Sequence, residues 1–315
     1  MKRPLHNDST DARANHIARV LNALHGDRTP GFHFAGHFLR VSCEQLDPEA
    51  TLMSMDVGPH GLTREGALDS VSLCIFADLA LAIAVRAAVP NPCRLATVDL
   101  QLQFTGLPVG ERVSARARFR ALHAAAPHLA LSEVDIVSGD TLIATGQASF
   151  MVLPLPEGRT VAALRAWQPS FAEPLLQPAE LTEDERAIYS AALRASAPDK
   201  AVFADAFWGI RVRPGASGAT SRLAVTPQVA NRVGHVQGGI LLGQAMQTAL
   251  ATVPPGWAVS SISANYLAPG MGSAVLGKAT PLHTGRSTAA SRIRLRRSDR
   301  TPVVEAQATM VAPKR

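Results

Sequence analysis

One order of elements occurs twice along this chain, and that repeat limits the fold more than any other feature of the sequence. Each copy opens with a helical pattern of apolar residues, at 9–25 and again at 181–193, where Thr182 can cap the second helix. An aromatic-rich segment follows in each copy, at 32–41 and 202–212, and its composition predicts a strand. The sequence therefore predicts two units built on one plan.

An apolar helix and then alternating strands complete each copy. The helices are predicted at 68–88 and 238–252, and the strands that follow them include 97–104 and 260–267. Apolar and polar side chains alternate in these strands, as they do in antiparallel strands with one buried face. One apolar helix followed by several such strands predicts an α+β fold, because a parallel sheet needs helices between its strands.

The segment between the two copies is predicted to be a linker. Residues 153–178 are rich in proline and also contain Gly158, a composition typical of connecting segments. A chain of 315 residues is long enough for two domains that each bury a core. We therefore divide the chain into an N-terminal domain at 1–152, a linker at 153–178 and a C-terminal domain at 179–315, each domain including its leading helix.

The overall composition excludes several other classes of protein. With 47% hydrophobic and 18% charged residues, the chain differs from disordered, collagen-like and coiled-coil sequences. The first residues lack the apolar core of a secretory signal, so a cytoplasmic protein is expected. The uncharged stretch 236–277 is broken by glycines, prolines and amides, so no membrane span is expected. The three cysteines form no CxxC pair and are expected to be reduced.

The charge balance is basic but without the pattern of a nucleic-acid-binding protein. The chain has 31 Lys and Arg against 25 Asp and Glu, a net charge of +6. No run of five basic residues occurs, and the densest basic cluster lies within 292–300. We therefore expect no nucleic-acid partner, and interpret the excess as a solvated surface or a site for a phosphorylated small molecule.

Asp78 is the only charged residue within 70–85, a segment that is apolar on nearly all helical faces. Such a helix is buried. An unpaired carboxylate inside it costs on the order of 3–5 kcal/mol of stability, unless the group is paired or protonated. A sequence that keeps this group usually has a use for it. The alternative is a carboxylate that reaches solvent or a partner at the edge of the helix, and both interpretations remain open.

The second informative segment, 231–239, places Gly238 and Gly239 directly before an apolar helix. Backbone N–H groups at a helix N-terminus form a site for an anion or a developing oxyanion, and glycines leave them accessible. The alternative is that the glycines serve only close packing or a tight turn.

Other common catalytic patterns are not found in the sequence. It has no Rossmann fingerprint, no P-loop, no metal-ligand cluster and no G-x-S-x-G elbow. His33 and His37 are four residues apart but lie in a predicted strand, and no metal site is expected there.

Together these segments resemble the hotdog-fold acyl-CoA thioesterases of the phenylacetate-pathway and 4-hydroxybenzoyl-CoA thioesterase type. The motif of that family is N-x-x-G-x-x-H-G-G, followed by an Asp or Glu on the central helix, fifteen residues after the Asn. The second half of the chain matches the loop, with Gln where His is usual, at Asn231, Gly234, Gln237, Gly238 and Gly239.

The carboxylate of this motif stands in the other half of the chain. Fifteen residues after Asn231 the sequence has Met246, whereas fifteen residues after Thr63 it has Asp78. Residues 63–71 occupy the loop register of the first half without the glycine pair. In the family that this chain resembles, the loop of one hotdog unit faces the helix carboxylate of the other. The resemblance therefore implies one complete composite site, and a dead reciprocal site at Met246.

The resemblance also implies the fold and the activity. The expected fold is two hotdog domains in tandem, each an antiparallel sheet wrapped around a long central helix, packed as a pseudo-dimer. Two separate sheets are expected. The expected activity is hydrolysis of an acyl-CoA thioester to a free acid and CoA, where CoA is part of the substrate and no separate cofactor is needed. The expected partner is the acyl-CoA itself, and the chains are candidates for a homodimer.

Roles for individual residues follow from the same resemblance. The N–H groups of Gly238 and Gly239 would polarise the thioester carbonyl. Asp78 would act as a general base on water or as a nucleophile, and Thr97 would assist it by a hydrogen bond. Asn231 and Gln237 would position the water or the acyl group. The candidates for binding the CoA phosphates are Arg286, Arg292 and Arg294. An equally good interpretation of these arginines is that they are solvated charges on an edge strand.

Two other functions are compatible with the same fold. The chain could be a non-catalytic acyl-CoA or lipid-binding hotdog protein in which Asp78 is structural, an alternative that the Gln at position 237 keeps open. A hotdog dehydratase or hydratase is disfavoured, because neither half shows the paired His and acid that this chemistry uses.

Overall fold

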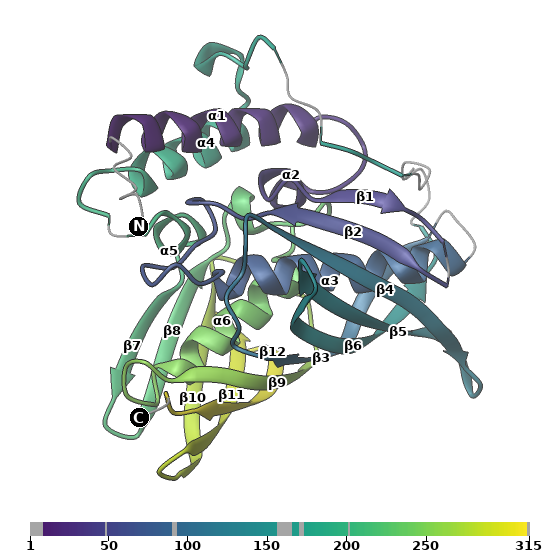
Figure 1. Cartoon of the computed structure of the whole chain (residues 1–315), viewed down its shortest axis with the longest axis vertical. Helices are drawn as coiled ribbons and strands as arrows, with labels where there is room; N and C mark the ends of the chain where they lie inside the picture. Colours follow the sequence, from purple (N-terminus) through teal and green to yellow (C-terminus); the bar gives the residue numbers. More distant parts are fainter. Residues whose placement is uncertain are drawn as a thin grey trace.

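A single antiparallel sheet curves around two central helices in this computed structural model, which describes residues 9–47, 49–89, 93–155, 166–169, 173–200 and 202–313 (Figure 1). Further helices lie on the opposite side of the central pair from the sheet, with α1 and α4 side by side (Figure 1). The central helices position the candidate site, and the outer helices hold the loop that leads to it.

The same order of elements occurs in both halves, as the repeat in the sequence predicts. The first half contains α1 (Ser9–Asp27), α2 (Phe34–Phe38), β1 (Ser42–Gln45), β2 (Thr51–Asp56), α3 (Ser70–Ala88), β3 (Arg94–Phe104), β4 (Arg112–His123), β5 (Ala126–Ser138) and β6 (Thr141–Leu153). The second half contains α4 (Glu183–Ala195), α5 (Phe203–Trp208), β7 (Arg211–Gly215), β8 (Gly218–Ala224), α6 (Gly238–Leu250), β9 (Ala258–Tyr266), β10 (Ala274–Thr284), β11 (Thr288–Arg297) and β12 (Pro302–Val311). Two short 3-10 helices add Pro178–Glu180 and Pro227–Val229.

The strand order shows that the two halves are related by an approximate two-fold axis. It runs β1-β2-β4-β5-β6-β3 and continues as β9-β12-β11-β10-β8-β7, which is the mirror order of equivalent strands. The halves meet where β3 pairs with β9, with Asp99 opposite Asn265 and Gln103 opposite Ser261. The expected α+β fold with two tandem units is confirmed.

One detail differs from the expectation, because the two sheets are joined into one rather than kept apart. The edge strand of an open sheet exposes unpaired N–H and C=O groups. Pairing β3 with β9 satisfies both edges at once, and the result is one sheet of twelve strands. The sheet still wraps two helices, one from each half.

The two central helices approach each other closely through glycines of α6. A Cβ atom at Gly239 would lie 2.6 Å from the Cα of Ile75, and one at Gly243 would lie 2.8 Å from the Cα of Val71. Side chains at these positions would push the helices apart. The glycines therefore bring the first turn of α6 against the middle of α3, where Asp78 lies.

Helix α3 is long and apolar enough to cross a membrane by length and composition, a property that the sequence analysis did not note. Within the protein, however, 78% of its most apolar window is buried. The sheet and α6 cover it, so its hydrophobicity is that of a core helix.

The predicted strands at 32–41 and 202–212 are wrong over most of their length. The structure has the short helices α2 and α5 there, and only the end of the second segment enters β7. The aromatic residues are spaced for a helix, with Phe34 stacked near Phe38 and Phe203 near Phe207. The rings of Phe38 and Phe207 lie 4.9 Å apart, so the two short helices share one aromatic core.

The other predicted elements agree within a few residues with the observed ones. Helix α3 begins after Asp69, whose side chain accepts a hydrogen bond from the Ser72 N–H at 2.8 Å and caps the helix. The division of the chain at 153–178 stays a prediction. Part of that segment, 156–165 and 170–172, lies outside the described residues.

Candidate active site

Asp78 lies in the middle of α3, and only 7% of its surface is exposed. Its neighbours along the helix, including Ala77 and Leu79, are also buried. The carboxylate points toward the first turn of α6, since a Cβ atom placed on Gly238 would lie 3.1 Å from its Oδ2 atom. The group is therefore a buried carboxylate at the contact between the two central helices.

Three donors surround this carboxylate. The Thr97 hydroxyl of β3 donates to Oδ1 of Asp78 at 3.2 Å, and the Gln237 side-chain amide donates to Oδ2 at 2.6 Å. The backbone N–H of Gly239 also interacts with the carboxylate. Both oxygens are thus hydrogen-bonded, which offsets much of the cost of burying a charge.

The ionisation of Asp78 reflects two opposing effects. Burial raises the pKa of Asp78 to about 6, because a low-dielectric environment disfavours the charged form. The hydrogen bonds from Thr97 and the Gly239 N–H act in the other direction and lower the pKa. The carboxylate is therefore mostly charged at pH 7 but accepts a proton more readily than an exposed Asp.

Gln237 connects the carboxylate to helix α6. Its Oε1 atom accepts a hydrogen bond from the Ile240 N–H at 3.0 Å, which makes it the N-cap of the helix. Its Nε2 atom donates to Asp78. A carboxamide has an acceptor and a donor on one planar group, so a single side chain fixes the helix start and the carboxylate together.

Gly238 leaves room beside the carboxylate. A Cβ atom at this position would lie 3.1 Å from Asp78 Oδ2 and 3.3 Å from the Thr97 hydroxyl. Gly238 is the first residue of α6, and the N–H of a first helical residue has no partner within its helix. The absence of a side chain at Gly238 therefore lets a helical N–H donor come close to the carboxylate.

Tyr266 is a component of the site that the sequence analysis missed. Its hydroxyl donates to the carbonyl oxygen of Gly238 at 2.9 Å. Burial raises the pKa of Tyr266 well above its usual range, and the nearby Asp78 charge raises it further. The one available signal was its place at the end of a predicted strand beside the glycine-rich loop.

Asn231 lies in the loop before α6, and its side-chain oxygen accepts hydrogen bonds from within that loop. Its Oδ1 atom accepts hydrogen bonds from the N–H groups of Val233 at 3.0 Å and His235 at 3.1 Å. These bonds hold the loop in a turn, and Gly234 takes the positive φ angle that the turn requires. A direct role of Asn231 in positioning water stays a prediction.

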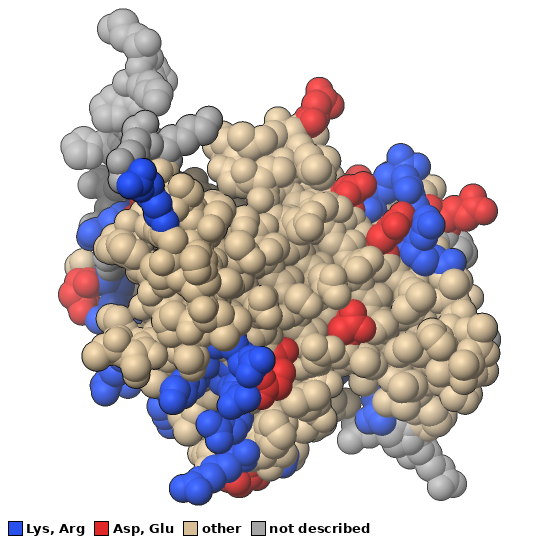
Figure 2. Space-filling model, turned by 90° about the horizontal axis from the view of Figure 1, so that it is seen from below, with Lys and Arg blue, Asp and Glu red and all other residues tan. Residues whose placement is uncertain are grey.

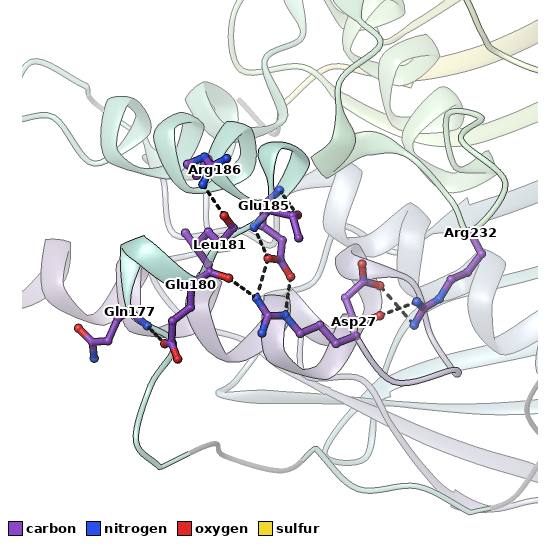
Figure 3. A network of polar contacts seen from close by, with 9 residues as sticks. Asp27, Gln177, Glu180, Leu181, Glu185, Arg186 and Arg232 are labelled. Carbon is purple, nitrogen blue, oxygen red and sulfur yellow. Dashed lines mark hydrogen bonds and ion pairs between the residues drawn. The ribbon is translucent and has the colours of Figure 1, made fainter.

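The loop is also fastened to α1 by Arg232, as Figure 3 shows. The guanidinium donates to the carbonyl oxygens of Asp27 at 2.5 Å, Thr29 at 2.8 Å and Phe32, and forms an ion pair with the Asp27 carboxylate at 3.3 Å. Arg28, the next residue, bonds Glu185 of α4 at 2.7 Å through two nitrogens. The outer helices thereby form a frame behind the loop that carries Gln237.

The structure does not bring Arg292 and Arg294 to this site. Residues of β11 alternate between the two faces of the sheet, and Ile293 and Leu295 are buried toward the core. The two arginines are exposed on the outer face, away from α3 and α6, and Arg294 pairs with Glu305 at 2.9 Å. Side-chain alternation therefore separates them from Asp78.

Arg286 is exposed in the turn between β10 and β11, at the end of the sheet opposite to Tyr266. Its neighbour Thr288 pairs with Val311, which pairs with Ala258 at the start of β9. Tyr266 is at the other end of β9, about 26 Å away at a rise of about 3.3 Å per residue. The part of these arginines in binding CoA stays a prediction.

The reciprocal position in the second half has no carboxylate. Met246 is buried, and its sulfur lies 3.3 Å from the Cys74 thiol of α3. The residue equivalent to Gln237 is Asp69, whose carboxylate accepts from the N–H and the hydroxyl of Ser72 and so faces its own helix. Burial raises the pKa of Asp69 to about 6.

In the described part of the chain, no group of three or more His, Cys, Asp or Glu side chains is placed to hold a metal ion. His33 and His37 lie at the start and end of α2, not in a strand. Burial lowers the pKa of both to about 4, so both imidazoles are neutral near pH 7.

Comparisons with known proteins agree with this architecture. Residues 226–311, in the second half, match the family model described as the acyl-CoA thioesterase N-terminal domain. No curated protein matches the chain in sequence. Among solved structures, a tesB protein from Mycobacterium avium subspecies paratuberculosis is 13% identical with a TM-score of 0.53, covering 86% of this chain and 96% of that one.

Two further structures extend the same likeness. Acyl-CoA thioesterase II TesB2 from Mycobacterium marinum is 14% identical with a TM-score of 0.50, covering 87% of this chain and 95% of that one. A protein of unknown function with a hot dog fold, from Alicyclobacillus acidocaldarius, is 10% identical with a TM-score of 0.51. The likeness covers 84% of this chain and 94% of that one. At these identities the structures show the fold, and they confirm two hotdog units in one chain.

The match to the family model confirms the resemblance to acyl-CoA thioesterases, over the half of the chain that carries the glycine loop. None of these comparisons supports the narrower likeness to the phenylacetate-pathway type.

Proposed function

We propose that this chain is an acyl-CoA thioesterase, a tandem hotdog protein that hydrolyses a thioester to a free acid and CoA at one site between its halves. The thioesterase domain match over 226–311 and the tandem hotdog fold support thioester hydrolysis. The location of the site is supported by one contact above all. The Gln237 amide of the second half lies 2.6 Å from the Asp78 carboxylate of the first.

In the proposed reaction, a water molecule attacks the carbonyl carbon of the thioester. Asp78 accepts a proton from the water, the carbon–sulfur bond breaks, and the proton passes to the sulfur of the leaving CoA. A pKa of about 6 suits this role, because the carboxylate is charged at pH 7 and still holds a proton well enough to transfer it.

The oxygen of the carbonyl gains negative charge as the water attacks. The N–H of Gly238 is the proposed donor to this oxyanion, since the first N–H of α6 has no helical partner and the helix N-terminus favours negative charge. The N–H of Gly239 interacts with Asp78 instead. Thr97 and Gln237 hold the carboxylate, and Tyr266 holds the Gly238 carbonyl, which shares a peptide unit with the Gly239 N–H.

A second mechanism uses Asp78 as the nucleophile, with an anhydride intermediate that water then cleaves. The two mechanisms differ in where the oxygen of water first appears. In a single turnover in ¹⁸O-labelled water, a general base places the label in the product acid. A nucleophilic Asp78 places it in the protein when water cleaves the anhydride at the aspartyl carbonyl, and mass spectrometry of the peptide that contains Asp78 then detects it. Label in that peptide would therefore exclude the general-base mechanism.

Non-catalytic binding of an acyl-CoA remains the second candidate, favoured by one observation. Both oxygens of Asp78 are already hydrogen-bonded, as in a structural carboxylate. A thiol-release assay over acyl-CoAs of different chain length and aromaticity separates the two functions. Thermal stabilisation by an acyl-CoA without release of thiol from any member of the panel would contradict the thioesterase and support the binding protein.

A further inference from the structure

Basic side chains gather on the outer face of β7, β8, β10 and β11, the face turned away from α3 and α6. Figure 2 shows Lys and Arg gathered on one part of the molecule, with few acidic side chains among them, whereas both charges mix elsewhere. The exposed residues of this basic face are Arg211, Arg213, Arg222, Lys278, Arg292, Arg294 and Arg296. In the described strands of this half, Glu305 is the one carboxylate on the same face.

The strand register arranges these residues in two rows. Arg211 lies opposite Arg222, which lies opposite Leu276, which lies opposite Arg296. Residues directly opposite on neighbouring strands share a face, so this row crosses four strands.

The second row is offset from the first by two residues along the strands. It runs from Arg213 through Thr220 and Lys278 to Arg294, and ends at Glu305. At about 4.8 Å between strands, the first row is about 14 Å wide and the second, which reaches β12, is about 19 Å wide. A groove of about 670 Å³ continues the face across β9 to β3, with Arg292 at its edge.

Two pairs in these rows bring like charges together. Arg211 is directly opposite Arg222, and Lys278 is directly opposite Arg294. Like charges at such positions destabilise a sheet. Folding alone therefore does not favour this arrangement, whereas an anionic partner would be attracted by it.

The first row lies near the end of the sheet where the candidate active site is found. Leu295, next to Arg296, pairs with Val304, which pairs with Tyr266. Two strand spacings, about 10 Å, separate this part of β11 from Tyr266. Since the Tyr266 hydroxyl contacts Gly238, the basic face and the site share one end of the molecule.

Exposed apolar side chains lie within the basic face and in the loop that follows β9. Leu276 is 42% exposed within the first row, and Leu267 and Met271 are 53% and 40% exposed in the loop after β9. That loop also contacts the loop before α6 that carries Gln237, because the Val236 N–H donates to the Gly270 carbonyl at 2.8 Å. A partner that covers this face and the loop would therefore meet apolar side chains as well as arginines.

We propose that this face docks an acidic carrier protein, which delivers the acyl group as a phosphopantetheine thioester. The inference rests on the proposed thioesterase activity and names a substrate class for it. Phosphopantetheine also forms the thiol end of CoA, so the reacting bond is the same in both substrates. The docking surface, not the chemistry, distinguishes them.

Other anionic partners fit the face less well. Nucleic acid would contact the arginines with its phosphates and leave Leu267, Met271 and Leu276 uncovered. A bilayer is flat, whereas the sheet curves around α3 and α6 and offers it only a strip (Figure 1). An acidic folded protein provides carboxylates and apolar side chains together.

The test uses the charge-reversed double variant Arg222→Glu, Arg296→Glu. Its control is Arg116→Glu, Arg194→Glu, which makes the same change in net charge at exposed positions on β4 and α4. Each protein is assayed with one acyl group carried either by CoA or by a purified acidic acyl carrier protein. Binding of the carrier protein without an acyl group is measured by calorimetry, and circular dichroism checks the fold.

For the double variant we expect kcat/KM on the carrier thioester to fall by about 10-fold or more, and on acyl-CoA by less than about 2-fold. The wild-type rate on the carrier thioester should also fall steeply with salt, and the control should behave like the wild type. Equal losses on both substrates would overturn the proposal, because the face would then bind CoA itself. Absence of carrier binding by the wild type, or binding only to RNA or to phosphatidylglycerol vesicles, would overturn it too.

Failure of the proposed function gives a different result. Wild-type protein that binds the carrier, and loses that binding in the double variant but not in the control, supports the docking face even when neither thioester is hydrolysed. That outcome contradicts the thioesterase alone.

Discussion

At the scale of single residues, the proposed hydrolysis depends on one buried carboxylate and the donors around it. Replacing Asp78 by Asn keeps the shape of the side chain but removes the group that accepts a proton. We expect turnover to fall by about 100-fold or more, the loss typical of an acid–base group. The thiol-release assay measures this on the best acyl-CoA of the panel.

The matched variant Thr97→Val removes only the hydroxyl that bonds Asp78 at 3.2 Å. A smaller loss is expected, because the Gln237 amide still holds the carboxylate. Near-normal turnover in the Asp78→Asn protein would show that Asp78 does not act on substrate.

The pH dependence follows from the raised pKa of Asp78. The proposed mechanism needs the charged carboxylate, so kcat/KM should rise with pH through about 6 and level off above it. A stopped assay between pH 4.5 and 8.5 measures the profile. A rate that does not change between pH 5 and 7 would exclude Asp78 as the base.

Stability should show the opposite trend for this group. Its folded pKa of about 6 lies above the ordinary 3.8, so the unfolded chain releases the proton first. The free energy of unfolding therefore falls as the pH rises from about 3.8 to about 6. Below this range the buried group costs nothing, and above it the full cost of the buried charge is present. Asp78→Asn removes it, and the variant should therefore unfold at the same or a higher temperature than the wild type at pH 7.

Asp78 and the glycine loop could be identified from the sequence because a lone charge in an apolar helix and a glycine pair before a helix are local signals. Tyr266 could not, since its contribution is a hydrogen bond to Gly238 that only the fold creates. Arg292 and Arg294 were chosen by charge alone, and the pleat of β11 places both on the outer face.

At the scale of elements, the first turn of α6 serves both the site and the packing, through neighbouring glycines. In Gly238→Ala the added methyl group would crowd Asp78 and Thr97, which are side chains that can shift. In Gly239→Ala it would meet the backbone of α3 at Ile75, which cannot. We expect the first variant to lose at least about 10-fold in kcat with little change in Tm.

The second variant should instead lose about 1–3 kcal/mol of stability, the usual range for overpacking a core. Thermal unfolding of both proteins, beside the activity assay, measures the difference. The same Tm loss in both, or full activity in Gly238→Ala, would contradict the assignment of Gly238 to the site.

The elements that periodicity predicts best are the long ones, α3, α6, β3 and β9, since each has many residues in register with its neighbours. The short helices α2 and α5 were predicted as strands because aromatic residues favour strands in general. Tertiary packing overrides that preference here, as Phe38 and Phe207 meet in an aromatic core that both halves build.

At the scale of the whole molecule, the proposal predicts one functional site per chain. Titration of the Asp78→Asn protein with an acyl-CoA should give a stoichiometry near one by calorimetry. The variant Met246→Asp should not add activity, because the loop that it would face has Asp69 and Ser70 where the second half has Gln237 and Gly238. A stoichiometry of two would contradict the single site.

The pairing of β3 with β9 could not be predicted from the sequence. Both strands have the alternating pattern of ordinary half-buried strands, and that pattern does not indicate which strand lies next to which. The repeat did predict that two equivalent units exist, and their pseudo-symmetric strand order agrees with it.

The continuous sheet of two covalently linked units also affects how such a protein can change over time. In a dimer of identical subunits, every substitution appears twice, so a carboxylate lost from one site is lost from both. In a fused chain, position 78 and position 246 mutate independently, although they are equivalent in space. One half is then free to specialise in its loop while the other retains its acid, and the outer surface of one half can become basic without the other following. A single chain with two units therefore lets its halves differ in ways that two identical subunits cannot.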